Sequence, residues 1–501
     1  MSDVVPPIRS AAEMLPYSAW AAEIPELPFE VDEWLRTLPK ERERLGRESR
    51  ALATPALHPT GIGRLAQVAA RLIGAAAEWA TVDLGRAVYR SVIYGERDDP
   101  HVSAAVERAQ QVVRDSGPVY VKLGQFISTA QGLLPNEVVD ALAWCRDEVP
   151  PVPTSVARRI VERELGQPID AVFESFGEFP LASASIAQVH AARLRDSGRE
   201  VVVKVRRPGL RRQFEADVRA MALLAAVGEA RSGAVRAANA HGFVELFAQL
   251  VLEEMDFRLE ALNMVEIGLA SEDAGMFEAL RVPRPMPGLV TQRVLVMEYL
   301  PGAPYTDAAG HFDADVDPAA IIRLGIQGVL EHTLVYGIFH GDLHAGNVFL
   351  EPDGRFVLLD FGIVGRLDAR QRAALVQFMM GVGTWDARAQ LEGLREFGAI
   401  PDDTDIAELA ATLEALDEQQ HPDVITHEQI VEGMGKVMRV LVAHGFRLPK
   451  ELVLFFKNLL YLNGLAATLA PDLNLLGEVD PIFQYFAAKY EQELSVFDNQ
   501  E

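Results

Sequence analysis

The feature that most constrains this chain is a pair of polar motifs joined by a short apolar run. The first motif, residues 340–347, reads HGDLHAGN; the second reads DFG, begins at Asp360 and follows the strand-like run 356–359. Phosphoryl transfer requires a carboxylate facing the attacking hydroxyl, together with oxygen ligands for magnesium. Asp342, Asn347 and Asp360 are these residue types, in the chain order that kinases use. Either motif alone fits an ordinary polar loop beside a strand, whereas the two together predict a phosphotransferase site.

Composition limits the partners that such a site can have. The 501 residues are 49% hydrophobic, so the chain can bury a large core as several domains or as one two-lobed domain. Lys and Arg number 47 and Asp and Glu number 72, which gives a net charge of −25. Because this charge repels phosphates, we expect no nucleic-acid partner, and a nucleotide site has to be locally basic. Cys145 is the single cysteine, so no disulfide can form within the chain.

Two long apolar stretches come nearest to the length of a membrane span. They are residues 65–84 and 452–470. Arg71 and other charged residues interrupt the first stretch, and Lys457 and Asn458 interrupt the second, so both predict buried or amphipathic helices. The first residues of the chain lack a basic segment followed by an apolar core. We therefore expect a cytoplasmic protein, with peripheral contact to a membrane as a further option.

Changes in pattern along the chain predict five parts. They are an N-terminal segment of unclear role (1–60), a helical extension (61–165), an N-terminal lobe with a helical insert (166–300), a C-terminal lobe (301–470), and a C-terminal helix with an acidic tail (471–501). The first part shows no sustained periodicity, although its residues 41–50 alternate in charge as an exposed helix does. In the second part, an Ala-rich helical pattern suits packing against a neighbouring helix, with a membrane-surface face as the alternative.

The third part has the layout of a nucleotide-binding lobe. A loop of small residues, Ala182, Ser183, Ala184 and Ser185, leads into a strand at 189–194. A second β run, residues 199–205, carries Lys204. Kinases have a glycine-rich phosphate loop and a lysine at these places. Small side chains still allow the backbone to approach phosphates, but Cβ atoms disfavour the conformations open to glycine, which predicts a stiffer loop.

Further along, a strand at 291–300 ends in a Pro-Gly break. In a two-lobed kinase this is the hinge, where backbone groups of Glu298, Tyr299 and Leu300 would bind the adenine edge.

Acidic residues repeat along a predicted single helix at 247–268. Glu253, Asp256 and Glu260 would share one face, whereas Glu254 would point away from Asp256. Such a row is most often solvated. The alternative is an acid that pairs with Lys204, as the Lys–Glu bridge of kinases does.

Two basic features also have more than one interpretation. Lys122 and Gln125 lie three residues apart, so they share a helical face, and by periodicity alone Lys122 is solvated. The basic turn at 206–212 is either solvated or in contact with an acidic partner.

These motifs together resemble the UbiB family, atypical protein-kinase-like proteins tied to isoprenoid-quinone biosynthesis. The resemblance spans roughly residues 100 to 470. The residues that carry it are Lys122-x-Gly-Gln125, Ala182 to His190, Val203-Lys204-Val205, Glu254-x-Asp256 with Glu260 and Asn263, His340 to Asn347, Asp360-Phe-Gly, and Asn463-Gly-Leu-Ala. The Lys-x-Gly-Gln and Glu-x-Asp elements are specific to this family.

The resemblance implies an α+β, two-lobed protein-kinase-like fold with a helical N-terminal extension over the active site and a largely α C-terminal lobe. It further implies a role for each matching residue. Lys204 would contact the ATP phosphates and pair with Glu260, Asp342 would be the catalytic-loop carboxylate, Asn347 and Asp360 would hold Mg²⁺, and Lys122 and Gln125 would cover the site with Glu254 and Asp256 facing them.

The implied activity is binding of Mg-ATP or ADP, with ATP hydrolysis or phosphorylation of a small or lipid-like acceptor. Such a protein would support quinone or prenyl-lipid metabolism, with lipid or quinone-biosynthesis enzymes as partners. This sequence departs from the family pattern at Ala345, where Pro is common, and its pattern predicts none of the membrane-spanning helices found at the end of several bacterial members. Two alternatives stay open, namely an aminoglycoside-type phosphotransferase for small metabolites and a nucleotide-gated scaffold without turnover.

Overall fold

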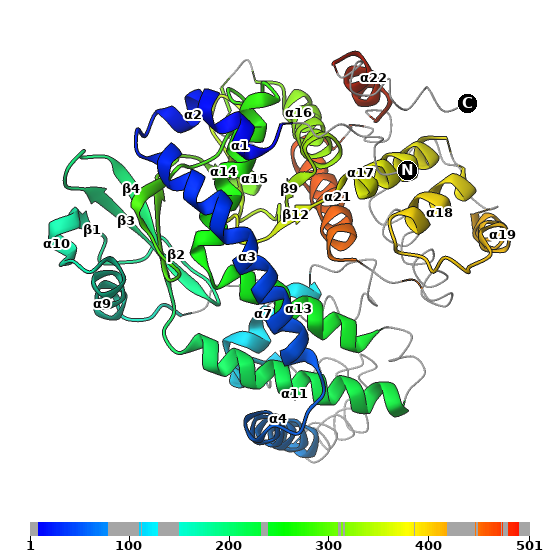
Figure 1. Cartoon of the computed structure of the whole chain (residues 1–501), viewed down its shortest axis with the longest axis horizontal. Helices are drawn as coiled ribbons and strands as arrows, with labels where there is room; N and C mark the ends of the chain where they lie inside the picture. The colour runs from blue at the N-terminus through cyan, green and yellow to red at the C-terminus, as the bar shows by residue number, and fades with distance from the viewer. Residues whose placement is uncertain are drawn as a thin grey trace, which may run out of the picture.

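The computed structural model describes residues 9–78, 110–111, 113–128, 150–231, 239–308, 312–313, 316–384, 386–417, 446, 449–471, 473 and 479–489. Within these ranges, antiparallel sheets combine with long helices, and Figure 1 shows the larger sheet on one side of the molecule and the helices of the C-terminal lobe on the other. The fold is the predicted α+β kinase-like fold. The five-part division of the chain stays a prediction, and Trp79, Cys145 and the tail after residue 489 lie outside the described residues.

The N-terminal lobe is built on a six-stranded sheet of order β1-β3-β4-β7-β6, with β2 paired to β3. Every recorded pairing in it is antiparallel. Central strand β4 is a valine run that is buried on both faces, since helices α9 and α14 contact the sheet. The strands are β1 (Phe173–Phe176), β2 (Ala182–Ser183), β3 (Ala187–Leu194), β4 (Glu200–Arg206), β6 (Pro285–Val290) and β7 (Val294–Glu298).

The C-terminal lobe carries two small sheets beneath this one. A four-stranded sheet has the order β5-β11-β10-β8, and a two-stranded sheet pairs β12 with β9. Their strands are β5 (Leu280–Arg281), β8 (Ala303–Pro304), β9 (Ile338–His340), β10 (Val348–Leu350), β11 (Phe356–Leu358) and β12 (Val364–Arg366). The two predicted motifs therefore lie on the loops that leave β9 and β11.

Helices make up the remainder of the described part of this lobe, as the resemblance implies. They are α15 (Tyr305–Ala308), α16 (Pro318–Leu330), a π-helix (Glu331–Tyr336), α17 (Ala369–Gly383), α18 (Ala387–Glu396), α19 (Ile406–Asp417), α21 (Lys450–Leu469) and α22 (Val479–Lys489). Helix α21 is the apolar stretch that Lys457 and Asn458 interrupt, and both of these side chains are buried.

The N-terminal segment packs on the body of the protein. Helix α3 (Leu27–Ala53) runs along α13, α14 and α11, and Figure 1 shows it crossing the front of the molecule. Its buried face is apolar, whereas its charged residues and Pro39 hide the periodicity in the sequence. The shorter elements of this segment are α1 (Ala11–Met14), a 3-10 helix (Leu15–Tyr17), α2 (Ala19–Ala22) and α4 (Pro59–Glu78), which packs on α11.

The predicted single helix over 247–268 is wrong. The chain forms α13 (Ala240–Glu254) and α14 (Phe257–Asp273), which follow α11 (Leu210–Arg231). Asp256 lies between them with extended backbone, and its carboxylate accepts a hydrogen bond from the backbone N–H of Arg258. Asp is a favoured N-cap because it satisfies a free N–H of the first helical turn, so it starts a second helix here.

Two further helices flank the nucleotide lobe. Helix α9 (Thr154–Leu165) ends at Gly166, whose φ of 69° is the left-handed conformation that closes a helix. The short α10 (Ile169–Val172) follows it. Helix α7 (Pro118–Ser128) carries Lys122 and Gln125 and contacts α11.

Trp20 is the anchor of the N-terminal segment. It is 1% exposed, its ring lies against Gly268 of α14, and its indole N–H donates to the carbonyl of Val282 at 3.2 Å. We expect Trp20→Ala to lower the free energy of unfolding by about 3–5 kcal/mol, because it removes a fully packed aromatic ring. Urea denaturation measures this change. Tyr17→Ala is the matched control, since Tyr17 is 85% exposed and its removal should have little effect. Equal losses in both variants would contradict the packing.

Candidate active site

Lys204, Glu260 and Asp360 meet at one point between the lobes. The Lys204 ammonium lies 2.7 Å from Glu260 Oε1 and 3.0 Å from Asp360 Oδ1. Strand β4 supplies the lysine, α14 supplies the glutamate, and the loop after β11 supplies Asp360. The valines beside Lys204 fix its strand in the sheet, where Lys204 pairs with Val189 and Leu295 of the neighbouring strands. The expected pair of Lys204 and Glu260 is present, and Asp360 also contacts Lys204.

The Lys204 ammonium, which Glu260 and Asp360 share, influences the pKa values of both carboxylates. Burial disfavours the charged form of Lys204, but Asp360 and Glu260 together raise its pKa. Burial raises the pKa of Glu260 to about 7 against the opposing effect of Lys204. Burial acts in the same direction on Asp360, yet Lys204 and Lys122 lower its pKa to about 2. Asp360 therefore stays ionised and suited to a cation.

The backbone of Asp360 is held in a conformation that most residues avoid. Its φ of 54° lies in the left-handed region, which Asp and Asn tolerate better than other non-glycine residues. Its carboxylate accepts a hydrogen bond from the Gly362 N–H at 3.2 Å. Next to it, Phe361 is fully buried and its carbonyl accepts a hydrogen bond from Asn263 at 2.7 Å. These contacts aim the Asp360 carboxylate at Lys204.

Hydrogen bonds within the 340–347 loop fix Asp342. Its backbone N–H donates to His340 Nδ1 at 3.1 Å, and the other ring nitrogen of His340 lies 3.0 Å from the carbonyl of Leu359. Burial lowers the pKa of His340, which matches a neutral ring that accepts on one side and donates on the other. The Asn347 side-chain nitrogen donates to the Asp342 carbonyl at 3.0 Å. The loop therefore holds Asp342 and Asn347 in one rigid turn.

Sequence reasoning missed a lysine that contacts Asp342. Lys457 of α21 places its ammonium 2.8 Å from Asp342 Oδ1, and the next residue, Asn458, donates to the carbonyl of His340. Burial favours the neutral form of Asp342, but Lys457 and His344 lower its pKa strongly. The signal was present, because two polar residues interrupt an apolar helix. Nothing in the local spacing shows that this helix reaches a loop more than one hundred positions earlier.

The extension reaches the site through α7. Lys122 forms a 2.5 Å ion pair with Glu254, so the alternative of a solvated lysine is wrong. Ser185 of the small-residue loop donates to the side-chain oxygen of Gln125 at 3.3 Å. Burial raises the pKa of Glu254, although Lys122 acts in the opposite direction. Helix α7 thus contacts both the end of α13 and the loop that would cover the phosphates.

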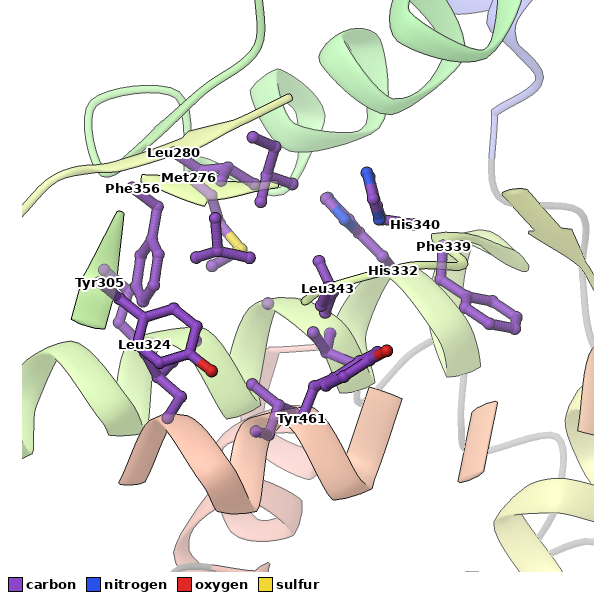
Figure 2. A pocket seen from close by; sticks show the side chains of 17 residues that line it. Met276, Leu280, Tyr305, Leu324, His332, Phe339, His340, Leu343, Phe356 and Tyr461 are labelled. Atoms are coloured by element: carbon purple, nitrogen blue, oxygen red, sulfur yellow. The ribbon is translucent and has the colours of Figure 1, made fainter. Parts of the chain in front are cut away.

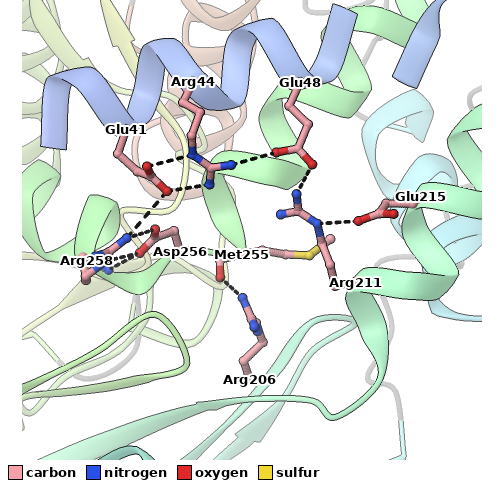
Figure 3. Close-up of polar contacts among 9 residues, drawn as sticks. All are labelled: Glu41, Arg44, Glu48, Arg206, Arg211, Glu215, Met255, Asp256 and Arg258. Carbon is pink, nitrogen blue, oxygen red and sulfur yellow. Dashed lines mark hydrogen bonds and ion pairs between the residues drawn. The ribbon is translucent and has the colours of Figure 1, made fainter. Parts of the chain in front are cut away.

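Asp256 does not face α7, contrary to the expectation from the resemblance. It forms a bidentate ion pair with Arg258 at 2.9 and 2.6 Å, and Arg258 also lies 3.7 Å from Glu41 of α3. Figure 3 shows these residues beneath α3, where Arg44 links Glu41 to Glu48. Asp256, through Arg258, therefore links the junction of α13 and α14 to α3 of the N-terminal segment.

The row of acids expected to be solvated is buried instead. Glu253, Glu254, Asp256 and Glu260 are each at most 8% exposed, and each has its own cation. Glu253 pairs with Lys450 at the start of α21 at 2.9 Å. The break at Asp256 changes the helix axis, so these acids point to different neighbours.

Arg207 holds the small-residue loop closed. Its guanidinium donates to the carbonyl of Ala184 and to the hydroxyl of Ser183, both at 2.8 Å. Ala182 and Ser183 pair with β3, while Ser185 is 1% exposed. The basic turn at 206–212 therefore makes contacts within the protein. Arg206 donates a hydrogen bond to the carbonyl of Met255, and Arg211 forms an ion pair with Glu48, as Figure 3 shows.

The hinge is tied to the N-terminal segment. The Glu298 carboxylate pairs with Arg284 at 2.8 Å, and Arg284 also donates to the carbonyl of Trp20. The backbone N–H of Tyr299 donates to Glu200 at 3.3 Å, and the Tyr299 side chain is 45% exposed. Leu300 is buried at the end of the strand. Adenine binding by residues 298–300 stays a prediction.

Asn347 and Asp360 fit a magnesium site that substrate phosphates complete. The Asn347 amide nitrogen is engaged by Asp342, so its oxygen is the atom left for a ligand. Magnesium in phosphotransferases takes one or two protein ligands together with phosphate oxygens and water. In the part of the chain that the structure describes, no group of three or more His, Cys, Asp or Glu residues forms a complete metal site.

A cavity of about 60 Å³ lies behind the catalytic loop. Figure 2 shows Tyr461, Leu324 and Met276 around it, with His340 and Leu343 of the loop region at its wall. The lining is almost wholly apolar, and the volume is far below the roughly 300 Å³ of a typical ligand pocket. The cavity therefore does not suit a nucleotide, whose phosphates need the charged site in front of the loop.

Comparison with known proteins agrees with a kinase-like class. Residues 144–393 match the model of the ABC1 atypical kinase-like domain. A chloroplastic aarF domain-containing protein kinase of Arabidopsis thaliana is 32% identical over 83% of this chain and 81% of its own length. A protein named "Probable protein kinase UbiB" from Azotobacter vinelandii is 30% identical over 78% of this chain and 73% of its own length. The chain belongs to the UbiB family of ABC1 atypical kinase-like proteins.

Two comparisons with Mycobacterium tuberculosis proteins complete the findings. A protein of strain H37Rv is 34% identical over 80% of this chain and 81% of its own length. A solved structure of another protein, in complex with erythromycin, has a TM-score of 0.44 and 24% identity, and it covers 69% of this chain and 90% of that chain.

Helix α21 alone, among the described residues, has the length and composition to cross a membrane. More than half of its apolar window, 56%, is buried inside the protein, as in the core helix of a globular lobe. The helix also supplies Lys457 to the site, which agrees with a place in the core.

The ion pair between Lys122 and Glu254 should hold the extension in place. We expect Lys122→Met to lower the free energy of unfolding by about 3 kcal/mol or more, because it leaves a buried carboxylate without its cation. The double variant Lys122→Met/Glu254→Gln should lose less than the sum of the single changes. Urea denaturation of the three variants measures the coupling.

The control for this pair is Arg158→Met. Arg158 pairs with Asp170 on the surface, where the side chains are 37% and 84% exposed, so its loss should cost less than about 1 kcal/mol. Additive effects of Lys122→Met and Glu254→Gln would show that the pair does not form in solution.

Proposed function

We propose that this protein binds Mg-ATP between its lobes and transfers the γ-phosphoryl group to water or to a small, lipid-like acceptor. The observation that carries the proposal is the meeting of Lys204, Glu260 and Asp360 beside Asp342 and Asn347, from segments far apart in the chain. This is the set of groups that phosphoryl transfer needs, arranged on a kinase-like fold. Membership of the UbiB family supports the same class of chemistry.

Each side chain has a task in this proposal. Glu260 holds the Lys204 ammonium toward the α and β phosphates, as in the Lys–Glu bridge of kinases. Asp342 accepts the proton of the attacking water or hydroxyl. The oxygen of that group forms a bond to the γ-phosphorus, the bond from phosphorus to the bridging oxygen breaks, and ADP leaves with the electron pair.

Asn347 and Asp360 would hold magnesium, which neutralises charge on the phosphate oxygens when it is bound. Lys204 now pairs with Asp360, so binding of a cation at Asp360 would release the ammonium for the phosphates. Four carboxylates (Glu254, Glu260, Asp342 and Asp360) and three lysines (Lys122, Lys204 and Lys457) face the site. The site is therefore not locally basic, contrary to the expectation from the sequence, and a bound divalent cation would supply the positive charge that phosphates need there.

The position of α7 argues for a restricted acceptor. Its contacts to Glu254 and to Ser185 set it against the loop and helix where a large substrate would approach. A small or lipid-like acceptor needs less room than a folded protein does. We place this activity in quinone or prenyl-lipid metabolism because of the family, with a cytoplasmic location and peripheral contact to membrane or partner enzymes.

Asp360→Asn tests the proposal. Asn tolerates the left-handed backbone of this position, so the variant keeps the loop while it removes the negative charge. We expect magnesium-dependent ATP hydrolysis to fall about a hundredfold or more, because several kcal/mol of ionic stabilisation is lost. Release of inorganic phosphate measures the rate.

Asp353→Asn is the control for this variant. Asp353 lies in the turn between β10 and β11, where it pairs with Arg355 at the surface, so its replacement should leave the rate unchanged. Equal rates for the wild type and Asp360→Asn would refute the proposed site.

A second candidate function is a nucleotide-gated scaffold without turnover. The direct contact between Lys204 and Asp360 favours it, because the cation-binding carboxylate is already paired. Nucleotide binding by the wild type without phosphate release, in the presence of candidate acceptors, would support the scaffold over the enzyme.

A further inference from the structure

Helix α21 presents a buried ammonium to the catalytic loop. Lys457 is 6% exposed, and its Nζ lies 2.8 Å from Asp342 Oδ1. Within the described ranges, Asp342 is the one carboxylate in ion-pair distance of this ammonium. An ammonium has three hydrogens to donate, so Asp342 leaves donor capacity for a ligand. A buried lysine that uses only part of its hydrogen-bond donors has donors left for a negatively charged group of the substrate.

The other two lysines of the site are already engaged elsewhere. Lys204 lies between Glu260 and Asp360, and Lys122 pairs with Glu254 on the side of the extension. Lys457 approaches from beneath the loop, in the C-terminal lobe. It is therefore the cation placed at Asp342, where the acceptor oxygen and the γ-phosphate would meet.

Distances support contact with the transferred group. A general base lies about 3 Å from the oxygen that it deprotonates, and that oxygen lies about 3–3.5 Å from the atom that it attacks. Since the Lys457 ammonium is 2.8 Å from the same carboxylate, a phosphoryl group held on that side of Asp342 would have its oxygens within reach of this ammonium. Charge spreads over those oxygens in the transition state, and a fixed cation stabilises it.

We propose that Lys457 binds the γ-phosphate of ATP and is a catalytic residue of the transfer, an inference that rests on the proposed function. The loop does not need Lys457 as a tether. Asn458 already holds its backbone at His340, and His340 bonds to Leu359. A lysine in an apolar helix beside Phe455 costs desolvation that an apolar residue would avoid.

The aromatic residue one turn along α21 keeps the ammonium in place. The Lys457 Nζ lies 5.6 Å from the centre of the Tyr461 ring, a cation–π distance. Tyr461 packs edge-on against His344, whose ring nitrogen is 3.9 Å from the second oxygen of Asp342. These contacts hold the Lys457 ammonium next to Asp342.

The test compares affinities for ATP and ADP, which differ by the γ-phosphate. Titration calorimetry of the full chain with magnesium and each nucleotide gives the ratio of the two dissociation constants. We expect Lys457→Met to weaken ATP binding about tenfold and to leave ADP binding unchanged, because only ATP has a phosphate in reach of the lost charge. Turnover should fall about a hundredfold or more.

Asn458→Ala is the matched control, on the same helix and against the same loop. It removes a backbone tether without a charge, so it should reduce turnover while the ratio of ATP to ADP affinity stays as in the wild type. Lys457→Gln is the second variant in case Lys457→Met does not fold, and the same loss of ATP preference is expected. Lys457→Arg, which keeps the charge, should recover part of that preference.

The outcomes separate this inference from the proposed function. An unchanged affinity ratio in the Lys457 variants, with reduced or normal turnover, overturns a γ-phosphate contact and leaves Lys457 a positioning or structural residue. A wild-type chain that binds neither nucleotide overturns the proposed function and this inference together. Loss of ATP preference in Lys457→Met, but not in Asn458→Ala, supports the contact.

Discussion

The shared ammonium of Lys204 is the interaction on which the rest of the site depends. It joins a strand of the upper sheet, a helix behind that sheet and a loop of the lower lobe within 3.0 Å. Without this cation, the buried carboxylate of Glu260 would lie close to the partly exposed carboxylate of Asp360 with no positive charge between them. The pairing therefore ties the two lobes together at this point.

Other charges are arranged in the same way, with each acid next to a cation from a distant part of the chain. Glu254 meets Lys122 of the extension, and Glu253 meets Lys450 at the start of α21. Asp256 caps the start of α14 and pairs with Arg258. Arg258 also lies near Glu41, so this pair connects α14 to α3. The break between α13 and α14 thus directs the acids to different partners and gives the N-terminal segment a structural part in the site.

The lower half of the site is held from beneath by α21. Lys457 and Asn458 are the polar positions of an otherwise buried apolar helix, and both contact the catalytic loop. A small apolar cavity lies behind the loop, whereas the charged side chains of Lys204, Asp360 and Lys457 approach the site from the two lobes.

Much of this was visible in the sequence, because local spacing encodes local structure. The valine run with Lys204 and the motif with Asp342 and Asn347 each depend on neighbours a few positions away. Contacts between residues far apart in the chain cannot be read from local spacing. Arg207 on the small-residue loop, Lys457 on Asp342 and Trp20 under the hinge arise only when packing brings remote segments together. The residue types, their order and the Lys204–Glu260 pair were therefore accessible from the sequence, whereas the other partners of the buried charges were decided by the tertiary structure, since a charge removed from water takes whichever opposite charge the fold places beside it.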